Sequence, residues 1–194
     1  MYYELIIQAF WLILPAYIAN ASALILGGGL PIDFGRKWKD GNRLLGDGKT
    51  WRGLLIGTFV GMTAGFGFSI ISKFAKNINF PISINDFTGF PLMIPILFSI
   101  CFGALLGDII ESFFKRRIGR NRGENWIPFD QIDFIIGVLV FSYLISSVLY
   151  ILNLTDENWF LINFTFYHII ILIIFTPFIH LFANYVHTKS KKRS

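Results

Sequence analysis

The sequence predicts an all-α, polytopic integral membrane protein with about five transmembrane helices. Of its 194 residues, 54% are hydrophobic and only 15% are charged, whereas about 25% of the residues in a soluble domain are charged. Long runs without a charged residue recur along the chain, each close to the roughly 20 residues that cross a hydrocarbon core of about 30 Å. Because backbone amides in lipid must be satisfied within their own segment, these runs should be helices. We expect one membrane-embedded domain, residues 1–194.

The expected spans are about Leu5–Leu26, Gly53–Ser72, Phe90–Ile110, Phe134–Ile151 and Leu161–Tyr185. Glu4, in place of a basic segment, indicates that the first span is retained and not removed as a signal. Pro15 within that span predicts a kink. The second span has glycines at four-residue spacing, which leaves one helix face open to close approach by another helix. These glycines are Gly53, Gly57, Gly61 and Gly65.

The lysines and arginines predict the orientation of the spans. Six lie between Gly27 and Arg52, five between Glu111 and Asp133, and four after Thr188, so 15 of the 17 fall on one side of the membrane. By the positive-inside rule this side is cytoplasmic, which places the N-terminus outside and the C-terminus inside. The net charge of +5 therefore follows from topology and needs no nucleic-acid partner.

The densest group of charged residues lies between Gly107 and Asp133, at the boundary of two predicted spans. Asp108, Ser112 and Lys115 are spaced i, i+4, i+7 and so share one face if the helix continues. Asp130 and Asp133 are spaced i, i+3 and share a face of the next helix. A single such acid can be an ordinary helix-end charge. Acids on two adjacent helices beside a basic loop instead favour the interpretation that these carboxylates are oxygen ligands of Mg²⁺.

The other cytoplasmic loop, about residues 27–52, is rich in glycine and basic residues. Its GDGKT stretch lacks the first glycine of a P-loop, because Arg43 stands there. Lys49, Thr50 and Arg52 nevertheless begin a helix whose N-terminus favours anions, so we predict phosphate contacts there. For Asn20, near the end of the first span, the sequence leaves open helix packing and a hydrogen bond to a ligand. The two cytoplasmic loops, about 27–52 and 111–133, are expected to form the active site.

The stretches GDIIESFFKRR and FDQID, taken with PAYIANAS, GGGLPIDFG and LLGDGKTWRG, resemble the signature of the CDP-diglyceride synthetases. The similarity is closest to the archaeal branch, the CDP-archaeol synthases, and covers most of Pro15 to Gly137. The intervening segment, RIGRNRGENWIPF, is shorter than that of the bacterial enzymes and lacks their His-Gly-Gly.

The resemblance implies a membrane nucleotidyltransferase of phospholipid biosynthesis. It would transfer CMP from CTP to 2,3-bis-O-geranylgeranylglycerol 1-phosphate, giving CDP-archaeol and pyrophosphate at the cytoplasmic face of the cell membrane. By the same resemblance, Mg²⁺ is held by Asp108, Asp130 and Asp133. The sequence leaves the oligomeric state open, with a homodimer as one possibility. Phosphate oxygens would be neutralised by Lys49, Arg52, Lys115 and Arg116, and would accept hydrogen bonds from Asn20, Thr50 and Ser112.

Two alternatives use the same features. Another small lipid enzyme, an acyltransferase or a prenyl-phosphate transferase, could share the basic face. A transporter would carry charged residues along a path across the membrane, but here they cluster on one side.

Overall fold

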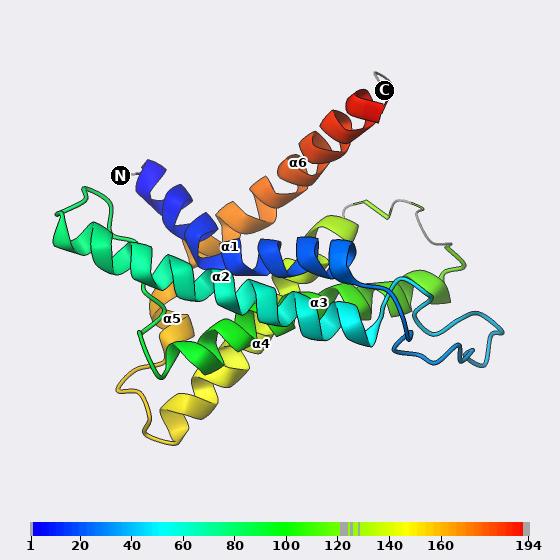
Figure 1. Cartoon of the computed structure of the whole chain (residues 1–194), viewed down its shortest axis with the longest axis horizontal. Helices are drawn as coiled ribbons and strands as arrows, with labels where there is room; N and C mark the ends of the chain where they lie inside the picture. Colours follow the sequence, from blue (N-terminus) through cyan, green and yellow to red (C-terminus); the bar gives the residue numbers. More distant parts are fainter. Residues whose placement is uncertain (1, 121–123, 125, 128, 192–194) are drawn as a thin grey trace.

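The computed structural model describes residues 2–120, 124, 126–127 and 129–191, with side chains from residue 3 to residue 178. The described part is all-α, as predicted, and Figure 1 shows its helices. They are α1 (Tyr2–Leu26), α2 (Trp51–Asn77), α3 (Met93–Arg117), α4 (Phe129–Ile151), α5 (Trp159–Asn163) and α6 (Phe166–Lys191).

The connections alternate between the two ends of the molecule. The loop between α1 and α2 lies at the same end as the close of α3, on the right in Figure 1. The N-terminus and the loops from α2 to α3 and from α4 to α5 lie at the other end, while α6 runs out towards the first end. This is the alternation that the predicted topology requires.

Helices α1 to α4 are each long and apolar enough to cross a membrane. In α6 the apolar part with described side chains is Phe166–Phe178. Helix α1 bends midway along its length (Figure 1), and Pro15 lies within it, as the sequence predicted. Length and composition thus agree with the predicted multi-pass membrane fold.

The helices are packed closely through glycines. A Cβ added to Gly61 would lie 2.7 Å from the Ala19 Cβ and 2.8 Å from the Pro15 carbonyl, so the predicted glycine face of α2 is pressed against α1. Helices α3 and α4 meet in the same way. A Cβ on Gly107 would lie 2.3 Å from the Asp133 carbonyl, and one on Gly137 would lie 2.1 Å from the Gly103 carbonyl. The helix backbones that carry Asp108 and Asp133 are therefore in direct contact.

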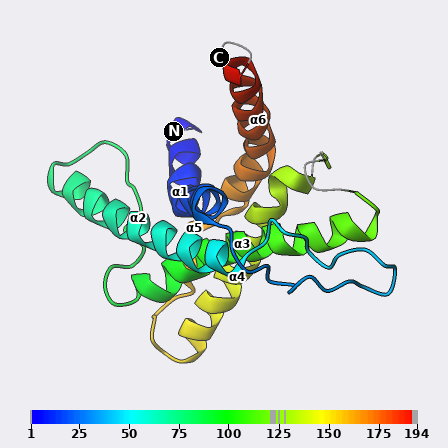
Figure 2. The same cartoon turned by 45° about the vertical axis from the view of Figure 1, so that its right-hand side comes forward.

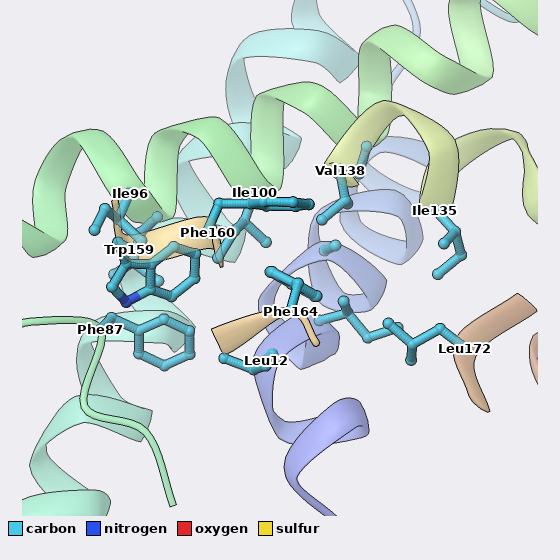
Figure 3. Packing of buried hydrophobic residues seen from close by; sticks show 14 of the residues in the cluster. Leu12, Phe87, Ile96, Ile100, Ile135, Val138, Trp159, Phe160, Phe164 and Leu172 are labelled. Carbon is cyan, nitrogen blue, oxygen red and sulfur yellow. The ribbon is translucent and has the colours of Figure 1, made fainter. Parts of the chain in front are cut away.

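The main hydrophobic core lies towards the end of the molecule opposite the α1–α2 loop. Phe87, Trp159 and Phe164 pack there against α1 and α3 (Figure 3), with the Trp159 and Phe164 ring centroids 5.9 Å apart. The sequence predicted one helix over Leu161–Tyr185, but α5 ends at Asn163 and α6 begins at Phe166. Trp159, Phe160 and Phe164, on both sides of α5, are all buried in the core at this break.

Candidate active site

A cavity of about 230 Å³ opens where α1, α2, α3 and α4 meet the α1–α2 loop. It brings together six of the residues that the sequence singled out, from four separate segments. They are Asn20, Lys49, Thr50, Asp108, Asp130 and Asp133. Apolar side chains, among them Leu54, Leu105 and Phe134, form the rest of the wall. The cavity is therefore a polar site that is partly enclosed by membrane helices.

Thr50 fixes the entrance to α2 beside this cavity. It is the N-cap residue, in an extended conformation, and its Oγ1 accepts hydrogen bonds from the Gly53 N–H at 3.0 Å and the Gly28 N–H at 3.2 Å. The second bond ties the end of α1 to the start of α2. The cap thus holds the ends of the α1–α2 loop together and places the preceding residue, Lys49, at the cavity.

Lys49 supplies the positive charge in the cavity. Its Nζ lies 2.5 Å from Oδ2 of Asp108, and both side chains are partly exposed to the cavity. Across the cavity on α1, Oδ1 of Asn20 is buried and has no hydrogen-bond partner among the described residues. An unsatisfied buried acceptor is costly. Asn20 therefore has an acceptor oxygen available for a donor group of a ligand, which favours the second of its two predicted roles.

Three carboxylates form the candidate metal site. Asp108 and Glu111 of α3 and Asp133 of α4 each offer an oxygen, and these oxygens lie within 4.8 Å of one another. Oε1 of Glu111 is buried and accepts no hydrogen bond from a described residue. Carboxylate oxygens are the ligands that Mg²⁺ prefers, and a buried carboxylate oxygen without a hydrogen bond is one that a bound cation would satisfy. The donor set therefore fits a divalent cation.

This cluster differs from the predicted ligand set, because Glu111 stands in it where Asp130 was expected. Sequence reasoning missed Glu111, although its i, i+3 spacing from Asp108 was a usable signal. Asp130 lies alongside, paired with Lys115, whose Nζ is 2.8 and 2.9 Å from its two oxygens. Oδ2 of Asp130 also accepts from the Trp126 N–H at 2.7 Å.

The remaining predicted residues lie outside the cavity wall. Arg52 is exposed on the first turn of α2, and Ser112 is buried within α3. Arg116 donates from Nε to the Leu45 carbonyl, with the two atoms 3.4 Å apart. This contact attaches the α1–α2 loop to the end of α3. Direct phosphate contacts of these three residues stay predictions.

An apolar groove of about 420 Å³ follows the α3–α4 contact. Its lining includes Phe114, Phe129, Ile136 and Val140, all of them between 48% and 54% exposed. Glu111 and Asp133 line the same groove, and Asp133 lines the polar cavity too. The carboxylates thus stand between a polar compartment and an apolar one.

Comparison with known proteins bears on the whole chain. A family model described as "CarS-like: CDP-archaeol synthase" matches residues 2–192. The CDP-archaeol synthase of Methanosarcina barkeri is 42% identical over 181 residues, which are 89% of this chain and 93% of that protein. The CDP-archaeol synthase of Thermococcus onnurineus is also 42% identical, over 93% of this chain and 90% of that protein.

A solved structure agrees with the fold. It belongs to an intramembrane enzyme for archaeal membrane lipid biosynthesis, is 35% identical, and superposes with a TM-score of 0.70 over 92% of this chain and 94% of that one. The predicted resemblance, the membrane location and the assignment to the nucleotidyltransferases are thereby confirmed. The chain belongs to the CDP-archaeol synthase family.

Proposed function

We propose that the chain transfers CMP from CTP to 2,3-bis-O-geranylgeranylglycerol 1-phosphate at the site described above, giving CDP-archaeol and pyrophosphate. One observation carries the placement of the two substrates: the polar cavity and the apolar groove share a wall at Asp133. A reaction between a water-soluble triphosphate and a membrane lipid needs two such compartments that meet at the reacting phosphates.

In this reaction an oxygen of the lipid phosphate attacks the α-phosphorus of CTP. The new P–O bond forms as the bond to the β-phosphate oxygen breaks, and pyrophosphate leaves. A phosphate monoester is already anionic near pH 7, so no strong base is needed. The barrier lies in bringing anions together and in stabilising the charge that develops on the leaving group, which positioned cations and dipoles supply.

The residues that would hold Mg²⁺ are Asp108, Glu111 and Asp133, whose oxygens already lie together. When bound, the cation would neutralise phosphate charge and hold the two substrates in register. The chain's own contribution is to keep three carboxylates in one place. It does so on two helices whose backbones are in contact at Gly107 and Gly137.

Lys49 and Asn20 would bind the triphosphate in the polar cavity. The Lys49 ammonium, which pairs with Asp108 at 2.5 Å, can turn to a phosphate oxygen without leaving the cavity. The Asn20 side chain, donating from Nδ2, and the hydroxyl proton of Thr50 would add hydrogen bonds to phosphate oxygens. Lys115 does not line the polar cavity and would act beside it. Asp130 holds its ammonium next to Glu111, with Nζ 3.8 Å from Oε1, so that it would add positive charge near the candidate metal site.

The lipid would enter sideways from the bilayer. Exposed apolar side chains of α3 and α4 line the groove, and its polar part is the pair Glu111 and Asp133. A prenyl chain in the groove would bring its phosphate to the candidate metal site. The predicted homodimer adds nothing to this arrangement, and it stays a prediction.

The test is incorporation of label from [α-³²P]CTP into lipid in membranes that contain the chain. Labelled CDP-lipid should form only when the lipid phosphate, CTP and a divalent cation are all present. An acyltransferase or prenyl-phosphate transferase would leave the lipid unlabelled, and so would a transporter. Absence of labelled lipid from a folded, membrane-inserted protein would refute the proposal.

A further inference from the structure

Asp33, in the α1–α2 loop, is a buried carboxylate outside the cavity. It is only 5% exposed, and its two oxygens accept five hydrogen bonds. The Arg43 side chain donates from Nε at 3.2 Å and from Nη2 at 2.8 Å. The N–H groups of Gly35, Leu45 and Gly46 donate at 3.1, 3.0 and 3.1 Å. One side chain therefore gathers both halves of the loop.

We propose that Asp33 is a positioning residue for the CTP site, acting through the loop segment that carries Lys49. The proposal rests on the proposed function, in which Lys49 binds the triphosphate. Asp33 does not line the cavity and so makes no contact with substrate there. Its role would be to hold the loop in the conformation that places Lys49 in the wall of the polar cavity.

The contacts from Asp33 to Lys49 are continuous. The Gly46 N–H donates to Asp33, and the Gly46 carbonyl accepts from the Lys49 N–H at 3.3 Å. The Lys49 carbonyl accepts from the Ile32 N–H at 2.9 Å, one residue before Asp33, which closes a ring of hydrogen bonds through the Asp33 side chain. The Lys49 side chain then reaches Asp108. A change at Asp33 is therefore transmitted to the Lys49 backbone on both sides.

The same carboxylate docks the loop onto α3. Leu45, whose N–H donates to Asp33, accepts a hydrogen bond at its carbonyl from Arg116 Nε. Arg116 also lies against Gly46, since a Cβ built on that glycine would be 3.4 Å from Nε. Gly46 has a φ of +94°, a conformation that favours glycine, so the loop is shaped to keep this approach. Asp33 thus orders the segment that Arg116 holds.

The charge of Asp33 is constant in the working range of pH. Burial alone would raise the pKa of its carboxyl, but the Arg43 guanidinium and the three backbone N–H groups hold the pKa well below its usual range. The side chain is therefore an anion at neutral pH and accepts all five bonds. An asparagine of the same shape would present an N–H to at least one of these donors, leaving it unpaired and buried.

The loop itself offers a matched control. Asp47 also pairs with Arg43, through Nη1 at 2.8 Å, but its side chain is 69% exposed. An exposed pair of this kind contributes little. Asp47→Asn removes the same charge from the same arginine without disturbing the buried hydrogen bonds. Comparing Asp33→Asn with Asp47→Asn therefore separates loop positioning from simple loss of loop charge.

The experiment measures steady-state kinetics of the full chain in lipid, with CTP and lipid phosphate varied separately. Asp33→Asn should raise KM for CTP by about tenfold or more, since a lost charged hydrogen bond is worth that much. KM for the lipid phosphate and kcat at saturating CTP should stay within about threefold of the parent. Asp47→Asn should match the parent. Arg43→Lys, which keeps the charge but loses the forked donor, should give a smaller rise of the same kind.

A second readout needs no activity. Trypsin should cut the loop at Lys39 or Arg43 several-fold faster in Asp33→Asn than in the parent or Asp47→Asn. If Asp33→Asn has the KM for CTP and the cleavage rate of the parent, the inference is wrong. It is also wrong if the variant changes KM for CTP, KM for the lipid phosphate and kcat by the same factor. Lys49→Ala tests the proposed function separately. If Lys49→Ala leaves KM for CTP unchanged, the placement of CTP fails; if it raises KM while Asp33→Asn does not, only the positioning role fails.

Discussion

The Lys115 ammonium donates to both carboxylate oxygens of Asp130, at 2.8 and 2.9 Å, and so joins the last turns of α3 to the first turn of α4. The Lys115 side chain is 10% exposed and that of Asp130 is 24% exposed. Breaking a pair this buried by removing one partner costs more than the pair itself contributes, because a charge is left without compensation. The pair lies beside Glu111, so its loss should be felt at the candidate metal site.

The first prediction concerns Asp130. Asp130→Asn should abolish CMP transfer, with kcat lower by at least about 100-fold, the scale seen when one catalytic electrostatic contact is lost. The neutral amide cannot hold the Lys115 ammonium in place. Membrane insertion should be unchanged, as checked by fractionation beside the labelled-CTP assay. Turnover like that of the parent would remove Asp130 from the site.

The second prediction concerns the metal. Glu111→Gln should weaken Mn²⁺ binding by at least about tenfold, since changes even in the groups that support metal ligands cost 10–100-fold. Mn²⁺ titration followed by electron paramagnetic resonance measures this in the absence of substrate. Glu157→Gln, in the loop between α4 and α5, is the control and should bind like the parent. Equal Mn²⁺ affinity in both variants would exclude Glu111 as a ligand.

The third prediction concerns the apolar groove. Val140→Trp should fill part of it and raise KM for the lipid phosphate several-fold, with KM for CTP unchanged, because Val140 lines the groove and not the polar cavity. Val148→Trp is the matched control: Val148 lies on the same helix and is 49% exposed, against 54% for Val140, but does not line the groove. Similar KM values for the lipid phosphate in the two variants would show that the hydrocarbon tail of the lipid binds elsewhere.

The fourth prediction concerns helix packing. Gly137→Ala should lower the free energy of unfolding by about 1–3 kcal/mol, the usual cost of overpacking, because its Cβ would meet the Gly103 carbonyl at 2.1 Å. Gly67→Ala on α2 meets nothing within 4 Å and should be neutral or stabilising. Thermal unfolding in detergent compares them. A Tm for Gly137→Ala no lower than that for Gly67→Ala would contradict close α3–α4 contact.

The fifth prediction concerns pH. The pKa of Asp33 is lower in the folded loop than the value of about 3.9 for a free side chain. The stabilisation from its ionised form is therefore fully present above about pH 4 and is lost as pH falls below that value. Hydrogen exchange at the Leu45 and Gly46 amides should show the same protection from pH 8 to pH 5. Protection that declines within this range would mean that Asp33 does not control the loop.

Much of the fold could be predicted because an apolar segment in a bilayer must satisfy its own backbone hydrogen bonds and therefore forms a helix. The uncharged run that begins at Phe134 was expected to mark the start of a helix, yet α4 begins at Phe129. Charge marks where a chain leaves lipid, not where its helix ends. The interruption after Asn163 had no signal in hydropathy, and Trp159 and Phe160 beside it are buried in a core that distant segments build.

The site was predictable where helical spacing or local loop chemistry defined it. Asp108, Asp133 and Lys49 do meet at one cavity. Glu111 was missed because the helix face of Asp108, Ser112 and Lys115, spaced i, i+4, i+7, was preferred, and Glu111 at i+3 lies one residue away from that face. Asp33 was missed because all its partners except Gly35 lie 10 to 13 residues along the chain, and only the closed loop reveals them. The orientation in the membrane and the homodimer stay predictions.

The contact between Gly107 and the Asp133 carbonyl has a consequence for substrate choice. Because no side chain lies between the two helices at this point, the contact of their backbones sets the distance between the acids of α3 and those of α4. Replacing residues around the groove can retune which hydrocarbon tail is accepted. It cannot respace the acids, so variants of this enzyme should change their lipids far more readily than their chemistry.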